Sequence, residues 1–184
     1  MSDTEKTKAI FIDRDGVINE PVYRGDRLQV PLTLEEFILL PGAIDGVGLL
    51  KDMGYLCLVM TNQPDVAFGD LSLQSLKTMH DFIRLKMPVD DVVFCPHSTK
   101  SDECNCCKPK TGMIDDLVEK YNIDLAKSFI IGDRWREAEL GKNVGCRTIH
   151  IPSSATPYNS PPFKMDFAVG NLIEAAKLIK EVGS

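Results

Sequence analysis

The sequence predicts an α/β fold built on a doubly wound, mostly parallel sheet. Short apolar stretches with the length of buried strands alternate with longer stretches in which apolar residues have helical spacing. Polar residues directly follow several predicted strands, at the edge where open α/β sheets bind ligands. The 184 residues suffice for one domain, or one domain with a small insertion, and we expect a single domain over residues 1–184.

Each predicted element rests on a local pattern. Gly54 ends the first helix, and Ser72 and Thr111 stand where they can cap the next two. Residues 20–40 are expected to be irregular because prolines and a glycine interrupt any periodicity, and residues 152–164 to form a proline-rich surface loop. Strands are expected at 9–12, 56–60, 92–95, 128–131, 147–151 and 167–169, and helices at 43–53, 72–87, 113–121, 137–143 and 172–182.

Two acidic residues, Asp13 and Asp15, directly follow the first predicted strand. Side chains two residues apart in an extended segment share a face, so the carboxylates can converge, and Gly16 lets the chain turn away. Neighbouring carboxylates repel each other unless they share a cation or a proton. Magnesium suits this position because it binds one or two carboxylates together with substrate phosphate. A surface turn, in which Asp and Gly are also common, is the alternative.

Other predicted strands also end in chemically useful residues. Thr61 and Asn62 follow the second strand, Lys108 follows the segment after the third, and Asp133 follows the fourth. Alone, each fits an ordinary turn residue or a solvated side chain. Together with the aspartate pair they supply a nucleophile, an acid, a hydroxyl, a cation and a further carboxylate, which suits phosphoryl transfer.

Four segments, residues 13–17, 61–63, 108–113 and 132–133, resemble in this order the four motifs of the haloacid dehalogenase (HAD) superfamily of phosphatases. The resemblance covers about residues 8–182. It implies a HAD-like Rossmannoid fold without a large cap domain. It also implies magnesium-dependent hydrolysis of phosphomonoesters through an aspartyl-phosphate.

By this resemblance, each site residue has an expected role. Asp13 attacks phosphorus, and Asp15 protonates the leaving oxygen and then deprotonates the attacking water. Thr61 and the N–H of Asn62 bind phosphoryl oxygens, and Lys108 neutralises charge on the nucleophile and the phosphate. The expected magnesium ligands are Asp13, the backbone carbonyl of Asp15, and Asp133.

Cys95, His97, Cys104 and Cys106 have the spacing of a structural metal site. Cys-x-His and Cys-x-Cys, separated by six residues, offer three thiolates and one imidazole, a standard tetrahedral zinc set. Zinc can fix a loop with too few apolar residues to fold alone, and we expect residues 95–108 to form a zinc-binding loop. Reduced surface cysteines beside an unrelated histidine are the alternative.

The remaining cysteines and histidines are expected to be structural, with one exception. Cys57 and Cys146 lie in or beside predicted strands and suit the core. Cys107 is an extra thiol that could compete as a zinc ligand. His80, on the long helix, and His150, in the fifth strand, have no evident partner.

The zinc pattern resembles that of a capless HAD group containing D-glycero-D-manno-heptose 1,7-bisphosphate phosphatases and histidinol-phosphate phosphatases. This likeness implies a small phosphorylated metabolite as substrate. Removal of the 7-phosphate of the heptose bisphosphate is the leading expectation, and histidinol phosphate the alternative. The chain departs from the group at several places: Cys107 and Phe68 stand where arginines are usual, and Pro64-Asp65 replaces Ser-Gly.

Other residues can compensate for these departures. Arg134 occupies a position that is basic in the heptose enzymes and is expected to contact phosphate. Arg24 and Arg27, in the loop before residue 40, could replace the lost cations, and we expect Arg27 to bind substrate. Glu137 stands where the fourth motif commonly has Asp, and it can reach the metal or a water molecule.

Composition and charge limit the partners. The net charge of −6 argues against nucleic-acid binding, which needs a basic surface, and so against a DNA 3′-phosphatase. No apolar run reaches the roughly 18 residues that span a bilayer, and the first eight residues lack a signal-peptide pattern. We expect a cytoplasmic monomer. A non-catalytic binding module that keeps the fold is the second alternative.

Overall fold

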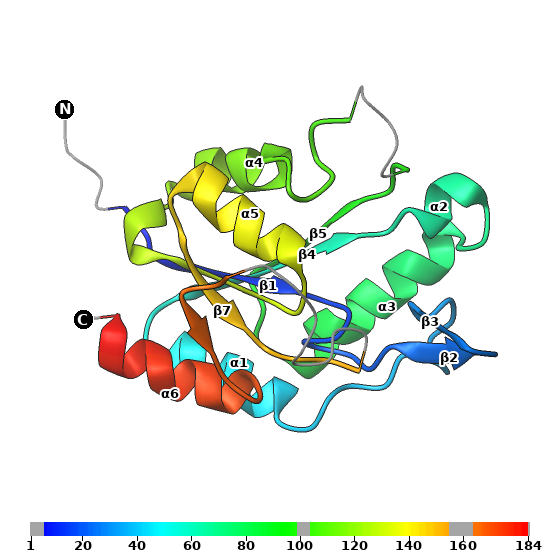
Figure 1. Ribbon diagram of the computed structural model, residues 1–184, viewed down its shortest axis with the longest axis horizontal. Helices are drawn as coiled ribbons and strands as arrows, with labels where there is room; N and C mark the ends of the chain where they lie inside the picture. Colours follow the sequence, from blue (N-terminus) through cyan, green and yellow to red (C-terminus); the bar gives the residue numbers. More distant parts are fainter. Residues whose placement is uncertain (1–5, 99–103, 155–163, 184) are drawn as a thin grey trace.

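The computed structural model describes residues 6–98, 104–154 and 164–183 and contains a sheet of six parallel strands (Figure 1). The strand order is β5-β4-β1-β6-β7-β8, so the chain adds strands first on one side of β1 and then on the other. The predicted doubly wound, mostly parallel sheet is therefore confirmed. The strands are β1 (Ala9–Asp13), β4 (Leu56–Asn62), β5 (Asp91–Cys95), β6 (Phe129–Gly132), β7 (Arg147–His150) and β8 (Phe167–Ala168).

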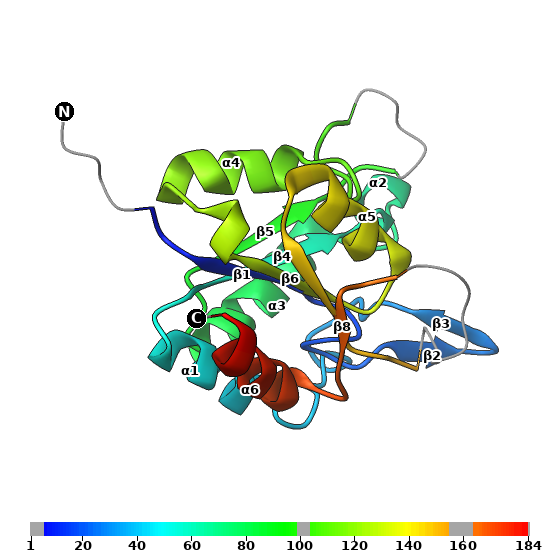
Figure 2. The ribbon, with the colours of Figure 1, turned by 60° about the vertical axis from the view of Figure 1, so that its left-hand side comes forward.

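Helices cover both faces of the sheet (Figures 1 and 2). One face packs against α1, α3 and α6, and the other against α4 and α5. The first four residues of β1 are apolar because both faces of the strand are buried: Ile10 and Ile12 belong to one core cluster, and Ala9 and Phe11 to the other. The helices are α1 (Ala43–Asp52), α3 (Leu73–Lys86), α4 (Gly112–Tyr121), α5 (Trp135–Val144) and α6 (Leu172–Val182), with a 3₁₀ turn at Leu125–Lys127.

The expectation that residues 20–40 are irregular was wrong for part of this segment. Strands β2 (Val22–Arg24) and β3 (Arg27–Gln29) form an antiparallel hairpin that projects beyond the main sheet (Figure 1). Gly25 has a positive φ of 61° in its two-residue turn, which glycine adopts without strain. The Gly-Asp pair was the available hairpin signal, and the flanking prolines lie outside the paired residues.

A short helix and one cap also differ from expectation. Helix α2 (Asp65–Phe68) was not predicted. The Ser72 side chain accepts a hydrogen bond from the Ser75 N–H and caps α3 as predicted. Thr111 makes no such cap, because its backbone is already helical and its hydroxyl donates to Asp115.

Most of the proline-rich segment, residues 155–163, lies outside the described residues. Within the described part of the chain, no helix combines the length and the apolar character needed to cross a bilayer.

Candidate active site

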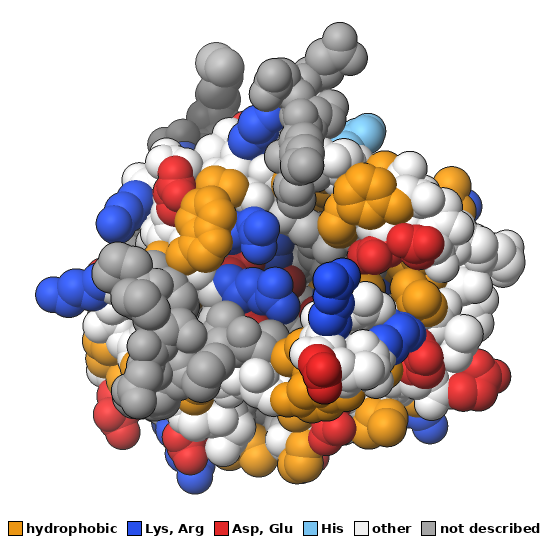
Figure 3. Space-filling view, turned by 45° about the vertical axis from the view of Figure 1, so that its right-hand side comes forward, with side chains coloured by type: hydrophobic (Ala, Val, Ile, Leu, Met, Phe, Trp, Pro, Cys, Tyr) orange, Lys and Arg blue, Asp and Glu red, His pale blue; other side chains and the backbone are white. Residues whose placement is uncertain are grey.

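The predicted strand-end residues meet in a cleft of about 280 Å³ at the carboxyl ends of β1, β4 and β6. The hairpin, the start of α2 and the start of α5 form its walls. Figure 3 shows Lys and Arg side chains over a hollow with acidic side chains deeper within it. A cleft of this size suits a small metabolite. Its lining residues are Asp13, Asp15, Leu28, Gln29, Val30, Thr61, Asn62, Pro64, Asp65, Lys108, Arg134, Arg136 and Glu137.

Three carboxylates converge on one point in this cleft. Asp13, Asp133 and Glu137 each offer an oxygen within 4.8 Å of the other two. Burial raises the pKa of Asp13 to about 6, and Glu137 adds to the rise while Lys108 opposes it. Burial and Asp13 likewise raise the pKa of Asp133. A divalent cation would remove this cost of clustered charge, and the all-oxygen donor set fits magnesium.

Glycines allow the carboxylates to come this close. Gly16 has a φ of 89°, and a Cβ there would lie 2.5 Å from Oδ2 of Asp133. A Cβ on Gly132 would lie 2.1 Å from Cγ of Glu137. Ser153 donates to Asp133 over 2.5 Å and holds it in place. Any larger side chain at either glycine would displace one of the carboxylates.

The ammonium group of Lys108 offsets part of the negative charge of the three carboxylates. Its ammonium group lies 2.7 Å from Asp13 and 2.8 Å from Glu137, and it donates to the carbonyl of Met60 over 3.0 Å. All three of its donors are therefore used, which orients it firmly. Burial alone would lower the pKa of Lys108, but Asp13 and Glu137 outweigh burial and raise it. Lys108 is therefore a permanent positive charge.

The Asp15 carboxylate lies apart from the three-carboxylate group and is surrounded by donors. Arg14 donates to both of its oxygens over 3.0 and 3.1 Å, and Asn19, Gln63 and Thr61 add hydrogen bonds of 3.0, 2.8 and 3.2 Å. Burial would raise the pKa of Asp15, but Arg14 and the hydrogen bonds lower it. The carboxylate is therefore held as an anion in this position.

Behind Asp15 lies a buried pair that sequence reasoning missed. Arg14 is fully buried, and its Nη1 lies 3.2 Å from Nε2 of His80 on α3. Because Arg has no acceptor atom, Nε2 of His80 must accept this hydrogen bond. Burial and Arg14 lower the pKa of His80 to about 3, so the ring is neutral. The sequence shows no evident partner for His80, and the structure supplies one in Arg14.

His150 also has a partner, since its Nε2 lies 3.3 Å from the carbonyl oxygen of Asp133. The sequence could not reveal either contact, because each joins segments that only the fold brings together.

Thr61 and Asn62 end β4 at the cleft, as predicted. Asn62 makes two hydrogen bonds with the Lys108 backbone: its Oδ1 accepts from the Lys108 N–H over 3.0 Å, and its Nδ2 donates to the Lys108 carbonyl over 3.1 Å. The Asn62 side chain thus fastens Lys108 to β4. This contact across 46 residues was not expected from the sequence.

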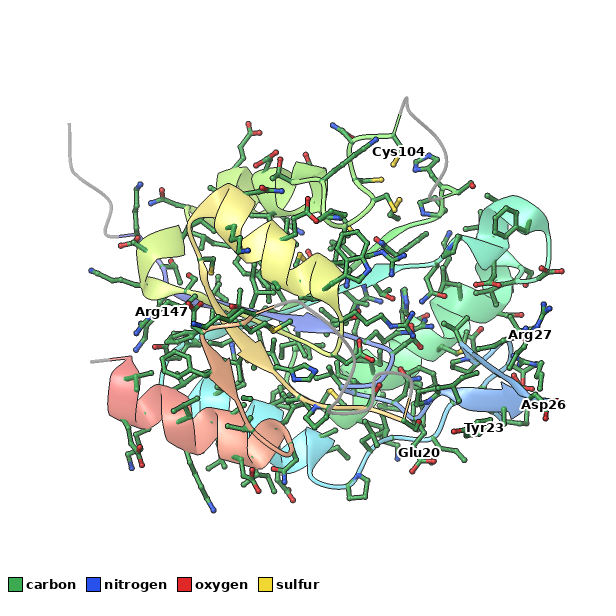
Figure 4. The ribbon with its side chains drawn as sticks, viewed as in Figure 1. Glu20, Tyr23, Asp26, Arg27, Cys104 and Arg147 are labelled. Atoms are coloured by element: carbon green, nitrogen blue, oxygen red, sulfur yellow. The ribbon has the colours of Figure 1, made fainter. Side chains whose placement is uncertain are left out.

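The predicted zinc residues form a second cluster, which fits a tetrahedral ion. The Sγ atoms of Cys95 and Cys104 lie 3.5 Å apart, those of Cys104 and Cys106 3.3 Å apart, and Nδ1 of His97 lies 3.3 Å from Sγ of Cys106. Thiolates around one zinc, with Zn–S bonds of about 2.3 Å, have comparable spacings. Figure 4 shows Cys104 in this sulfur-rich loop. Residues 99–103 between these ligands lie outside the described residues.

Cys107 is not a member of this cluster, so the expectation that it could compete as a ligand was wrong for this conformation. Its thiol is buried and lies 3.8 Å from the carbonyl oxygen of Lys108. Cys57 and Cys146 are buried core residues, as predicted.

The arginines are distributed differently from the expectation. Arg134, which is expected to contact phosphate, lines the cleft, with Nε 3.6 Å from Oδ1 of Asp133. Arg27 is exposed at the outer end of the hairpin and is not among the cleft-lining residues (Figure 4). Arg24 pairs with Glu36. Arg136, which sequence reasoning missed, lines the cleft instead.

An aspartate beside a buried lysine, at the end of a central strand and within reach of two further carboxylates, suits transfer of a phosphoryl group to that aspartate. Comparisons with known proteins agree. A family model described as HAD-hydrolase-like matches residues 105–175. The D-glycero-beta-D-manno-heptose-1,7-bisphosphate 7-phosphatase of Neisseria meningitidis serogroup A is 34% identical over 143 residues, covering 75% of this chain and 73% of that protein. The chain belongs to the HAD-like phosphatases.

Two further relatives match over nearly the whole chain. The D-glycero-alpha-D-manno-heptose-1,7-bisphosphate 7-phosphatase of Photorhabdus laumondii is 31% identical over 186 residues, covering 95% of this chain and 98% of that protein. The crystal structure of the D,D-heptose 1,7-bisphosphate phosphatase from B. bronchiseptica, complexed with magnesium and phosphate, superposes with a TM-score of 0.79. It is 26% identical and covers 96% of this chain and 99% of that one.

Proposed function

We propose that this phosphatase is magnesium-dependent, forms an aspartyl-phosphate on Asp13, and removes the 7-phosphate of D-glycero-D-manno-heptose 1,7-bisphosphate. The observation that carries the chemistry is the Asp13 carboxylate, held 2.7 Å from the Lys108 ammonium group and grouped with Asp133 and Glu137. The choice of substrate is based on the relatives, which are named for that activity.

In the first half-reaction, an oxygen of Asp13 attacks phosphorus while the bond to the leaving oxygen breaks. Thr61 and the N–H of Asn62 bind phosphoryl oxygens, and Lys108 offsets the charge on Asp13 and the phosphate. Asp15 supplies the proton that the leaving oxygen requires. Its donors favour the anion, but an incoming phosphate dianion opposes a second negative charge nearby and so favours protonation of Asp15. Binding of substrate thus prepares the acid.

In the second half-reaction, Asp15 is again an anion and accepts a proton from the attacking water. The water oxygen binds phosphorus, the bond to Asp13 breaks, and phosphate leaves with Asp13 restored. Magnesium would be held by Asp13, Asp133 and the backbone carbonyl of Asp15, with Glu137 as a further donor, and would supply charge neutralisation. Because burial raises the pKa of Asp13, this cation also favours the ionised nucleophile.

For the second cluster we propose a structural zinc ion on Cys95, His97, Cys104 and Cys106. It would hold residues 95–97 and 104–106 together, next to Lys108. Since Lys108 follows the last of these ligands by only two residues, the ion would restrain the lysine as well as the loop.

One observation favours the alternative substrate, histidinol phosphate. The carboxylate-bearing Asp65 on α2 lines the cleft and could pair with an ammonium group, which histidinol phosphate has and the heptose bisphosphate lacks. The heptose bisphosphate instead carries a second phosphate. A comparison of the two substrates therefore separates the two proposals.

The test is magnesium-dependent phosphate release from a panel containing both anomers of the heptose bisphosphate, histidinol phosphate, simple sugar phosphates and a 3′-phosphorylated oligonucleotide. Asp13→Asn is the matched control because it keeps the shape of the side chain and removes the nucleophile. Turnover of the heptose bisphosphate well above the other members, and lost in the variant, supports the proposal. Preferred turnover of histidinol phosphate would make that compound the proposed substrate. No phosphate release from any member of the panel, with both metals bound, would favour a binding module.

A further inference from the structure

Three cationic side chains line the cleft: Lys108, Arg134 and Arg136. Two of them already have carboxylate partners. Lys108 pairs with Asp13 and Glu137 at 2.7 and 2.8 Å, and Nε of Arg134 lies 3.6 Å from Oδ1 of Asp133. The charges of Lys108 and Arg134 are therefore offset by the carboxylates of the reacting centre.

Arg136 differs from both. Among the residues that the structure describes, no carboxylate lies within ion-pair distance of its guanidinium group. The guanidinium carbon lies 5.2 Å from the centre of the ring of Trp135, a cation–π contact with a neighbouring residue that is 45% exposed. Stacking leaves the N–H edge of a guanidinium group available, and that planar edge matches the oxygens of a phosphate.

The position of Arg136 relative to the nucleophile follows from α5. Glu137, the next residue, is buried against Lys108, whereas Arg136 is half-buried and lines the cleft. The first turn of α5 thus contributes both to the reacting centre and to the wall of the same small cleft. A substrate whose phosphate lies on Asp13 would extend past Arg136 within the cleft's roughly 280 Å³.

We propose that Arg136 binds a second anionic group of the substrate and so selects bisphosphorylated over monophosphorylated sugars. This inference rests on the proposed function in taking Asp13 as the site of the reacting phosphate. It adds a specificity residue on α5 that the sequence motifs do not indicate, in place of the exposed Arg27. Cys107, which stands where related enzymes have an arginine, cannot bind an anionic group, and Arg136 supplies a cation to the cleft instead.

The experiment measures inhibition of magnesium-dependent para-nitrophenyl phosphate hydrolysis by fructose 1,6-bisphosphate, fructose 1-phosphate and fructose 6-phosphate. The variants are Arg136→Gln, Arg136→Lys and the control Lys142→Gln, which removes an exposed charge from the same helix outside the cleft. The quantity of interest is the ratio of inhibition constants for bisphosphate and monophosphates within each variant. A general change in activity cancels in this ratio.

We expect wild type and Lys142→Gln to bind the bisphosphate about tenfold more tightly than either monophosphate, Arg136→Gln to lose this preference, and Arg136→Lys to keep part of it. An Arg136→Gln variant that retains the full preference, or a wild type that shows none, overturns the inference. Heptose bisphosphate turnover is measured in parallel on wild type. Absence of that turnover with an intact, Arg136-dependent bisphosphate preference would reject the proposed substrate and leave the inference standing.

Discussion

Replacing Lys108 with Met tests the electrostatic account of the site most directly. Met has a similar length and fills the same space, but it removes the ammonium group that lies 2.7 Å from Asp13 and 2.8 Å from Glu137. Lys108 is 3% exposed, so both carboxylates would lose a partner inside the protein. Breaking a buried pair in this way costs about 3–5 kcal/mol, because it leaves an uncompensated charge.

For a chain of this length, that loss corresponds to a Tm decrease of roughly 10 °C at pH 8 without added magnesium. Magnesium neutralises the same carboxylates, so it should stabilise Lys108→Met more than wild type. The kcat should fall by about a hundredfold or more, as when a group that stabilises the transition state is removed. Thermal unfolding without and with added magnesium, followed by steady-state kinetics, measures these effects.

The control is Lys120→Met, since Lys120 is also ion-paired, with Asp91 at 2.8 Å, but lies on the surface. Its Tm should change little. The reasoning would be refuted if Lys108→Met and Lys120→Met lowered the Tm equally without added magnesium, or if magnesium stabilised Lys108→Met no more than wild type.

Three further predictions follow from the same geometry. The pKa of Asp13 is raised to about 6 from 3.8, so the contribution of Asp13 to the stability of the metal-free protein is lost as the pH rises through about 6. Magnesium competes with the proton at Asp13, so magnesium affinity, measured by titration at pH 5 to 8, should weaken as the pH falls through about 6. Cys106→Ala should lower bound zinc, measured by metal analysis, from one equivalent to well below one, because a structural site needs all four ligands. His80→Ala should lower both Tm and kcat, because it leaves a buried donor of Arg14 without an acceptor at a cost of about 1–3 kcal/mol.

Each of these predictions has its own control. Magnesium affinity that is equal at pH 5 and pH 8 would contradict the competition with protons at Asp13. Cys107→Ala should retain zinc, and zinc loss equal to that of Cys106→Ala would mean that the ligand set is wrong. His80→Gln keeps an acceptor near Arg14 and should recover much of the lost activity; failure of both variants to the same extent would indicate a packing role for His80.

Local patterns were sufficient to predict most of the fold. Strand β1 is apolar from Ala9 to Ile12 because both of its faces are buried there, and this apolar run predicted the strand from the sequence. The hairpin at residues 22–29 escaped prediction because its strands are three residues long and pair with each other, away from the main sheet. Short strands of this kind have little periodicity to detect.

The sequence by itself determined the kind of site. The aspartate pair, Thr61 and Asp133 lie at the ends of their strands, and parallel strands bring their carboxyl ends to one edge, so their meeting was predictable from position. Lys108 follows the segment after β5, and its place in the set was predicted from the motif that it begins. The spacing of the cysteines and His97 likewise indicated a tetrahedral cluster, because its members lie close in the chain and the metal geometry limits the choices.

Only the tertiary structure decided which side chains pair within the site and which charge is left for the substrate. It joined Glu137 to Lys108, Arg14 to His80 across 66 residues, and Asn62 to the Lys108 backbone across 46. It also put Arg136 on the wall of the cleft and Arg27 outside it. Such contacts depend on strand order and on the direction in which each helix leaves the sheet. Those features arise from packing the whole chain, and no local stretch of sequence encodes them.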